Sequence, residues 1–141
     1  MWFYEAPHMN LHHEIVEYAR KIDVPQNLLP LKQDDNKAYE CLWVDSDGPL
    51  FRYFYRERGE TELIIQSTDR DVVLERIFSD ITFSMASDYE LKHRIEGQDS
   101  RRQLFAVEEN LMRQLKPEWG DNEIKRHVEI LKENPFLDKI Q

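Results

Sequence analysis

The longest helical pattern in the chain lies between Ser67 and Leu115. Apolar residues recur there at spacings of three and four, and no Gly or Pro interrupts residues 69–95. Such spacing places side chains on one face of an α-helix. Thr68 followed by Asp71 is typical of a helix start. The pattern therefore predicts one helix over 69–95, with Ile81 and Met85 in the core.

Before this helix the apolar residues alternate with a period of two, which is typical of strands. Alternation is seen over 38–44, 50–57 and 61–66. Turn residues separate these runs, Asp45 to Gly48 in the first gap and Arg58-Gly59 in the second. Short alternating runs joined by tight turns predict an antiparallel three-stranded meander. Only one face of such a sheet needs helices to cover it.

Three further helices complete the expected fold. Asn10 can cap a first helix that Pro25 ends. Gly97 suits the end or a kink of the long helix, Asp99 can cap the next, and Pro117 suits the first position of the last. The expected architecture is α+β. An N-terminal helix and a three-stranded meander precede three helices packed on one face of the sheet, in a single domain over 1–141.

The chain is acidic, which bears on its partners. Its 141 residues carry 28 acids and 19 bases, a net charge of −9, and 40% are hydrophobic. This composition is typical of a soluble globular protein with the size of one domain. A negative surface favours a basic partner and disfavours nucleic acid or anionic lipid as partners. The alternative is that the acids only keep the protein soluble.

Other features of the composition predict a cytoplasmic location. Cys41 is the single cysteine, so the chain can form no internal disulfide, which suits a reducing compartment. The opening MWFYEAPHMN has no basic segment and contains Glu5 and Pro7, unlike a signal peptide. No apolar stretch reaches the length of a membrane span.

No motif predicts catalysis or a bound cofactor. The four glycines are scattered, and neither a phosphate loop nor an H-E-x-x-H motif is present. Glu90 and His93 have the E-x-x-H spacing of di-iron bundles, which need a second such pair. The one partial match is Glu123 with His127, spaced by four. We therefore expect no catalytic residue, cofactor or metal site; a metal-dependent hydrolase using Glu90 and His93 is a minor alternative.

Charged residues around Gly97 predict a structural ion-pair network, because partly buried charges must be paired. We expect Arg94 to be at least half buried and paired with Glu90, Asp99 or another nearby acid. The expected network comprises Glu90, Arg94, Asp99, Arg101 and Arg102.

The meander is the best candidate for a partner-binding surface. Residues 33–66 carry eight acids and four bases, and aromatic residues alternate with charged ones in the middle strand. Aromatic rings on a partly exposed sheet are good interface anchors. The alternative is that the acids protect a sheet edge from aggregation. The expected binding residues are Asp45, Asp47, Tyr53, Tyr55, Glu57, Glu60 and Glu62.

Two segments carry unusual residue combinations, FRYFYRERGE and FSMASDYELKHRIEGQDSRRQLFAVEENLMRQLKPEW. In both, the chain resembles the immunity protein 63 family of bacterial polymorphic toxin systems, over roughly Tyr53 to Pro135. The resemblance implies a small cytosolic protein that binds and neutralises a cognate toxin domain stoichiometrically, and it supplies no catalytic residues. Because the chain is acidic, a basic nuclease domain would be a natural target. A structural or regulatory binding module without a toxin is the alternative.

Overall fold

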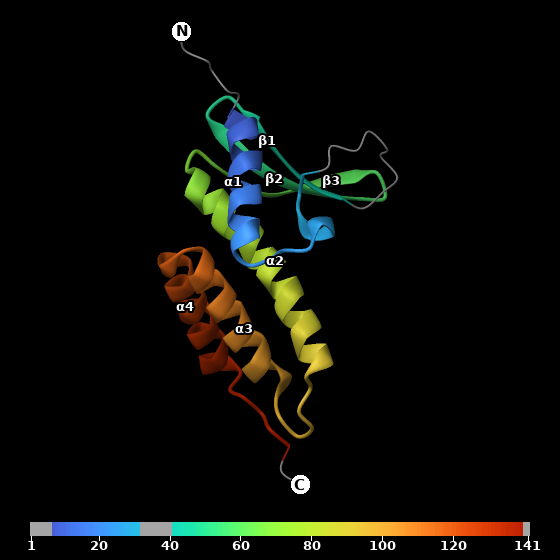
Figure 1. The fold of residues 1–141 in the computed structure, drawn as a ribbon, viewed down its shortest axis with the longest axis vertical. Helices are drawn as coiled ribbons and strands as arrows, with labels where there is room; N and C mark the ends of the chain where they lie inside the picture. The colour runs from blue at the N-terminus through green and yellow to red at the C-terminus, as the bar shows by residue number, and fades with distance from the viewer. Residues whose placement is uncertain (1–6, 32–40, 140–141) are drawn as a thin grey trace. The chain divides into compact units, whose positions relative to one another are not determined.

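The computed structural model describes residues 7–31 and 41–139, and it contains the elements that the sequence predicts (Figure 1). The elements occur in the order α1 (Pro7–Lys21), a short 3-10 helix η1 (Gln26–Leu28), β1 (Cys41–Asp47), β2 (Leu50–Glu57), β3 (Glu60–Ser67), α2 (Arg70–Lys92), α3 (Ser100–Leu115) and α4 (Pro117–Glu133). This order confirms the α+β prediction.

The chain divides into two compact units, Met1–Ile77 and Phe78–Gln141, and the boundary falls within α2. The first unit contains α1, the sheet and the first part of α2. The second contains the rest of α2 with α3 and α4, which pack on each other. The packing of α3 and α4 on the sheet, and the single domain over 1–141, stay predictions.

The three strands form an antiparallel sheet in the order β1-β2-β3, as expected. At the β2–β3 turn Arg58 and Gly59 both have positive φ, the conformation of the commonest two-residue hairpin turns. The prediction of the first turn was wrong by two to three residues, because β1 continues through Asp45 to Asp47. Asp45 stays in the strand because it pairs with Arg52 directly across the sheet. Residues 38–40 lie outside the described residues.

The core of the first unit joins α1, the sheet and the start of α2. Helix α1 begins at Pro7, so the expected cap at Asn10 was wrong; Asn10 lies inside the helix. An ion pair between Arg70 and Glu14, with 2.7 Å between Nη1 and Oε1, links α2 to α1. The buried apolar residues of this unit are Leu11, Ile15, Ala19, Ile22, Val44, Tyr53, Val73, Leu74 and Ile77.

The core of the second unit is organised along one line of α2. Buried positions on that line follow a spacing of four, at Phe78, Thr82, Ala86 and Glu90. Ile81 is also buried, as expected. The burial predicted for Met85 was wrong: its side chain is half-buried, although Ile81 one turn earlier is buried. Buried apolar side chains from the other helices are Phe105, Met112, Leu115 and Trp119.

Helix α2 ends at Lys92, three residues before the expected end at Ile95. The connection to α3 contains Gly97, whose φ of 82° lies in the left-handed region, so this residue reverses the chain after the helix rather than capping it. Asp99 is the N-cap of α3, as predicted, and accepts a hydrogen bond from the backbone N–H of Arg101. Pro117 opens α4, also as predicted.

Gly120 allows α4 to approach α3 closely. A Cβ atom at this position would lie 2.7 Å from Cβ and 2.9 Å from Cα of Arg113. A glycine lowers helix stability by about 1 kcal/mol relative to alanine. The contact between the two helix backbones therefore explains why a poor helix former occupies the first turn of α4.

We predict that Ile81→Ala lowers the free energy of unfolding by about 2–5 kcal/mol, because it leaves a cavity in a closed core. Met85→Ala should have a clearly smaller effect, since the Met85 side chain already contacts solvent. Urea unfolding of both variants compares the two sites. Equal losses would contradict this description of the core.

We predict that Gly120→Ala destabilises the protein, although alanine is the better helix former. The new methyl group would overlap the α3 backbone at Arg113, so the helices must separate. Denaturant unfolding of the variant tests the sign of the change. A gain of stability by the roughly 1 kcal/mol expected from helix propensity would show that the contact is not restrictive.

Candidate functional site

The predicted acidic residues of the meander lie in two groups at opposite ends of β2. Asp45 and Asp47 pair with the start of the strand, whereas Glu57 and Glu60 face each other across its end. The eight residues of β2 extend over about 25 Å at the usual rise per residue. The structure therefore does not bring these acids together in one cluster.

At the first end, Arg52 neutralises much of the acidic charge. Its Nε and Nη2 atoms each lie 2.8 Å from a carboxylate oxygen of Asp45, and its Nη1 lies 3.6 Å from Asp47. The hydrogen bond to Asp45 raises the pKa of Arg52. Asp45 is thus part of a structural ion pair within the sheet, and Asp47 is the more exposed acid at this end.

At the second end, three acids are exposed to solvent. Glu57 and Glu60 flank the Arg58-Gly59 turn, and Glu62 follows two residues later in β3. No ion pair among the described residues involves any of these three carboxylates. This group, Glu57, Glu60 and Glu62, is called the acidic hairpin end below.

The aromatic residues of β2 are divided between the two faces of the sheet. Tyr53 is 1% exposed and lies in the core, so the expectation of an exposed ring edge there was wrong. Tyr55 is half-buried on the same face, opposite Glu62. The alternation of residues predicted that β2 has two different faces. It did not predict which face is buried, because both faces carry aromatic rings.

The opposite face of the sheet carries stacked aromatic and arginine side chains, an arrangement that the sequence pattern did not predict. The rings of Trp43 and Phe54 are stacked with centroids 5.0 Å apart. The guanidinium of Arg56 lies 4.6 Å from the Trp43 centroid, and that of Arg52 lies 4.9 Å from the Phe54 centroid. Both rings are half-buried. We call these four residues the aromatic–arginine face; the Arg-x-Phe-x-Arg alternation of β2 is its sequence signal.

The expected charge network around Gly97 forms separate ion pairs. Arg94 donates to both carboxylate oxygens of Glu90, at 3.0 and 2.9 Å, as predicted. This bond lowers the pKa of Glu90. The burial predicted for Arg94 was wrong, since its side chain is 60% exposed. A residue just beyond a helix end can pair with the preceding turn while its guanidinium stays in water.

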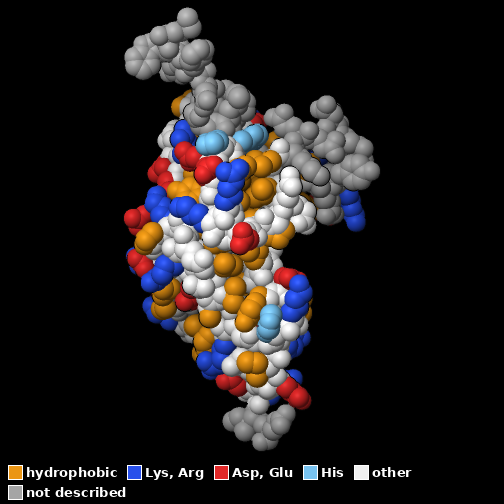
Figure 2. Space-filling model, in the orientation of Figure 1, with side chains coloured by type: hydrophobic (Ala, Val, Ile, Leu, Met, Phe, Trp, Pro, Cys, Tyr) orange, Lys and Arg blue, Asp and Glu red, His pale blue; other side chains and the backbone are white. Residues whose placement is uncertain are grey.

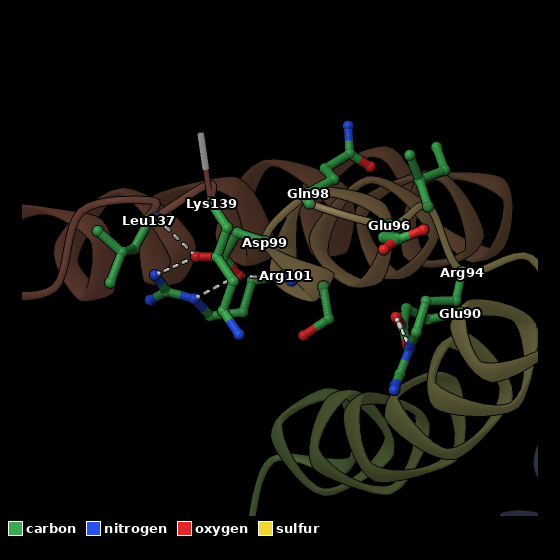
Figure 3. Close-up of a pocket in the computed structure, with 11 residues that line it drawn as sticks. Glu90, Arg94, Glu96, Gln98, Asp99, Arg101, Leu137 and Lys139 are labelled. Carbon is green, nitrogen blue, oxygen red and sulfur yellow. Dashed lines mark hydrogen bonds and ion pairs between the residues drawn. The ribbon is translucent and has the colours of Figure 1, made fainter. Parts of the chain in front are cut away.

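The other part of the network holds the segment that follows α4. The Asp99 carboxylate accepts hydrogen bonds from the Arg101 guanidinium and from the backbone N–H of Leu137 (Figure 3). Arg102 pairs with Asp138, and the N–H of Lys139 donates to the carbonyl of Gly97. The expected residues thus anchor residues 134–139 to the start of α3.

This arrangement encloses an open groove of about 850 Å³ within the second unit. Charged groups of Glu90, Arg94, Asp99 and Arg101 line it together with the apolar side chains of residues 95 and 137 (Figure 3). On the face that Figure 2 shows, acidic and basic side chains are interspersed. The groove therefore presents mixed charge and no single ligand chemistry.

Glu90 and His93 do not converge on a metal. Glu90 is bound to Arg94, whereas the His93 ring stacks on Tyr89 and its Nδ1 lies 2.9 Å from the Tyr89 carbonyl oxygen. Across the described residues, the group whose ligand atoms come within 4.8 Å of one another consists of Glu108, Glu123 and His127.

These three residues form a buried polar cluster between α3 and α4. His127 Nε2 lies 3.1 Å from Glu123 Oε1 and 3.7 Å from Glu108 Oε1, and His127 Nδ1 lies 2.6 Å from Glu109 Oε2. Arg126 pairs with the second oxygen of Glu123. Two sequence signals were present, an acid in the apolar stripe of α3 and the four-residue spacing of Glu123 and His127.

Burial and mutual contact shift the pKa values of this cluster. Burial and the charge of Glu123 raise the pKa of Glu108 to about 7. Burial also favours the neutral form of Glu123, but hydrogen bonds from His127 and Arg126 outweigh it and lower that pKa to about 2. Burial lowers the pKa of His127, yet its bonds to Glu123 and Glu109 produce a net rise. The cluster therefore favours a protonated imidazole beside one ionised and one partly protonated carboxyl.

We predict that Asp99→Asn reduces both stability at neutral pH and sensitivity to acid. Bonds from Arg101 and Leu137 hold the pKa of Asp99 well below its usual range. The ionised group therefore stabilises the fold above about pH 4, where the unfolded chain is also ionised, and this stabilisation is lost as the pH falls further.

Urea unfolding at about pH 7 and pH 2.5 measures this difference. Wild type should lose more stability on acidification than the variant does. Asp121→Asn, at an exposed ion pair with Arg113, is the matched control and should behave like wild type. The same acid sensitivity in wild type and Asp99→Asn would contradict the role of Asp99.

Comparisons with known proteins identify a family for this chain. None of the helices in the described ranges has the length and apolar character that a membrane span requires. No curated protein and no solved structure matches the chain. Residues 47–129, more than half of the chain, match the family described as Immunity protein 63. The match runs from the last residue of β1 through β2, β3, α2 and α3 into α4. The chain therefore belongs to the immunity protein 63 family.

Proposed function

We propose that this protein is a cytoplasmic immunity protein that binds a cognate toxin domain and blocks it stoichiometrically, without turnover. The family match over residues 47–129 is the observation that carries this proposal. The protein would act by covering the toxin's functional surface. A stable interface of this kind buries on the order of 1,200–2,000 Å², which the surface of one small domain can supply.

The sheet offers the surface that best suits such a partner. The aromatic–arginine face combines a Trp, a Phe and two Arg side chains, and Trp and Arg are enriched among residues that dominate binding energy. The acidic hairpin end lies at the turn that follows the same strand. Its carboxylates are on the side of the sheet that carries Tyr55, since Tyr55 and Glu62 are cross-strand partners. We propose that the face anchors the partner and that the acidic end attracts it.

Charge supports a basic toxin domain as the partner. The chain has a net charge of −9, and the three acids of the hairpin end are exposed. Complementary charge raises association rates from about 10⁵–10⁶ toward 10⁸–10⁹ M⁻¹s⁻¹. Rapid capture favours the survival of a cell that meets the toxin. A nuclease domain fits this description, because a surface that binds nucleic acid phosphates is basic.

Growth rescue tests the function against a binding module that has no toxin partner. The gene next to this one would be expressed in a host cell with and without the protein. The proposal expects the neighbouring product to stop growth and this protein to restore it. Toxicity that this protein does not relieve would contradict the proposal.

We predict that reversing the acidic hairpin end slows association with the purified toxin domain. The variant Glu57→Lys, Glu60→Lys, Glu62→Lys should also flatten the salt dependence of association, because the attraction is electrostatic. Its melting temperature should stay close to that of wild type, since the three side chains are exposed. Stopped-flow mixing at several salt concentrations measures both effects.

The control makes the same charge change elsewhere, with Glu118→Lys, Glu129→Lys and Glu133→Lys on the exposed side of α4. It should slow association much less. Equal slowing by the two variants would show that net charge alone matters. An unchanged rate in the hairpin variant would place the binding surface elsewhere. Asp45 is unsuitable for this test, because its reversal would break the ion pair with Arg52.

A further inference from the structure

The buried polar cluster between α3 and α4 has no role in the proposed toxin binding. Glu108 comes from α3, while Glu123 and His127 lie one turn apart on α4. All three side chains are at least nine-tenths buried. Each offers one ligand atom, and these atoms lie within 4.8 Å of one another. Two carboxylates and one imidazole are a donor set that zinc and similar divalent cations accept.

The distances fit a tetrahedral ion. With bonds of 2.0–2.2 Å, two ligand atoms of a tetrahedral zinc ion lie about 3.3–3.5 Å apart. His127 Nε2 lies 3.1 Å from Glu123 Oε1 and 3.7 Å from Glu108 Oε1, on either side of that separation. The ligand atoms of Glu108 and Glu123 lie within 4.8 Å of each other, so side-chain movement would have to bring this pair to the same spacing.

The imidazole is already held in the orientation that a metal ligand needs. His127 Nδ1 donates to Glu109 Oε2 at 2.6 Å, and the ring stacks on Phe105 with centroids 3.9 Å apart. Histidines that bind metals through Nε2 usually donate their other N–H to a carboxylate in this way. Glu109 thus directs Nε2 toward Glu108 and Glu123.

Glu108 makes the loosest contact in the cluster. Its Oε1 lies 3.7 Å from His127 Nε2, longer than a hydrogen bond, whereas Glu123 Oε1 lies 3.1 Å from the same nitrogen. A divalent cation between these atoms would replace this loose contact with a direct bond, and buried carboxylates are stable where they coordinate metals.

We propose that Glu108, Glu123 and His127 bind one divalent cation of the zinc type, with water as the fourth ligand and Glu109 orienting the histidine. Coordination through Nε2 needs a lone pair on this atom, so binding would release any proton that His127 carries there. Arg126 stays on the other oxygen of Glu123, so its ion pair is compatible with coordination through Oε1. Oxygen-preferring Mg²⁺ and Ca²⁺ suit an imidazole site poorly.

The site would join α3 to α4 and is independent of the proposed toxin binding. Helix α3 ends and helix α4 begins near Pro117, where the chain reverses. Their other contacts include the apolar core, the close approach at Gly120 and the ion pair between Arg113 and Asp121. A bound ion would add a link roughly two to three helical turns along α4 from that reversal. All four residues of the site lie within the segment that matches the family.

Metal titration of the untagged, full-length protein tests the proposal. After treatment with a chelator and removal of the chelator, the protein would be titrated with Zn²⁺ by calorimetry in buffers of different ionisation enthalpy. We expect one ion per chain, a raised melting temperature and release of protons on binding. With Co²⁺, we expect the intense visible absorption of a tetrahedral complex.

Variants separate this site from other ligands. Glu108→Gln keeps the side-chain shape but removes a ligand, and Glu109→Gln should weaken binding about 10–100-fold through the histidine. Glu90→Gln and His93→Ala, at the E-x-x-H pair, are controls and should bind like wild type. Circular dichroism would confirm that each variant folds.

Three results would overturn the proposal. They are no stoichiometric Zn²⁺ uptake by the wild type, octahedral Co²⁺ absorption, or Zn²⁺ binding by folded Glu108→Gln that equals the wild type. Loss of binding in Glu90→Gln or His93→Ala would place the ion at the E-x-x-H pair and not in the cluster between α3 and α4. Growth rescue does not enter this test, so the metal site and the toxin-binding function can fail separately.

Discussion

The structure depends on a single helix that supplies core residues to two units. The first part of α2 contributes Val73, Leu74 and Ile77 to the unit that contains the sheet, and the rest contributes Phe78, Ile81 and Ala86 to the unit that contains α3 and α4. A helix that faces one core needs one apolar stripe, whereas α2 must satisfy two. This requirement explains why its apolar residues extend over more than one face and why no Gly or Pro interrupts it.

Much of the fold could be predicted from local pattern. Periods of about 3.6 and two residues distinguish helices from strands. The cap Asp99 and the first-turn proline Pro117 mark where helices start. The sequence pattern was less informative about how deeply each side chain is buried. Met85 has the spacing of a core residue but is half-buried, and Arg94 pairs with Glu90 while remaining exposed. Both outcomes depend on which neighbouring helix covers a position. The spacing of residues along the chain carries no information about these neighbours.

The candidate surfaces and the buried cluster depend on pairing between distant segments. Alternation predicted that Tyr53 and Phe54 point to opposite faces, but only the pairing with β1 stacks Phe54 on Trp43 and leaves Tyr53 inside. Likewise, Glu108 and His127 meet because Gly120 allows α3 and α4 to approach. Their residue types were visible in the sequence, whereas their proximity was not.

Titration of toxin activity distinguishes inhibition by stoichiometric binding from inactivation with turnover. A fixed amount of the purified toxin domain, far above the dissociation constant, would receive increasing amounts of this protein. We expect activity to fall linearly and to reach zero at one molecule per toxin, without dependence on incubation time. Complete inactivation by a small fraction of an equivalent would indicate turnover. Activity that remains at a molar excess would contradict immunity by binding.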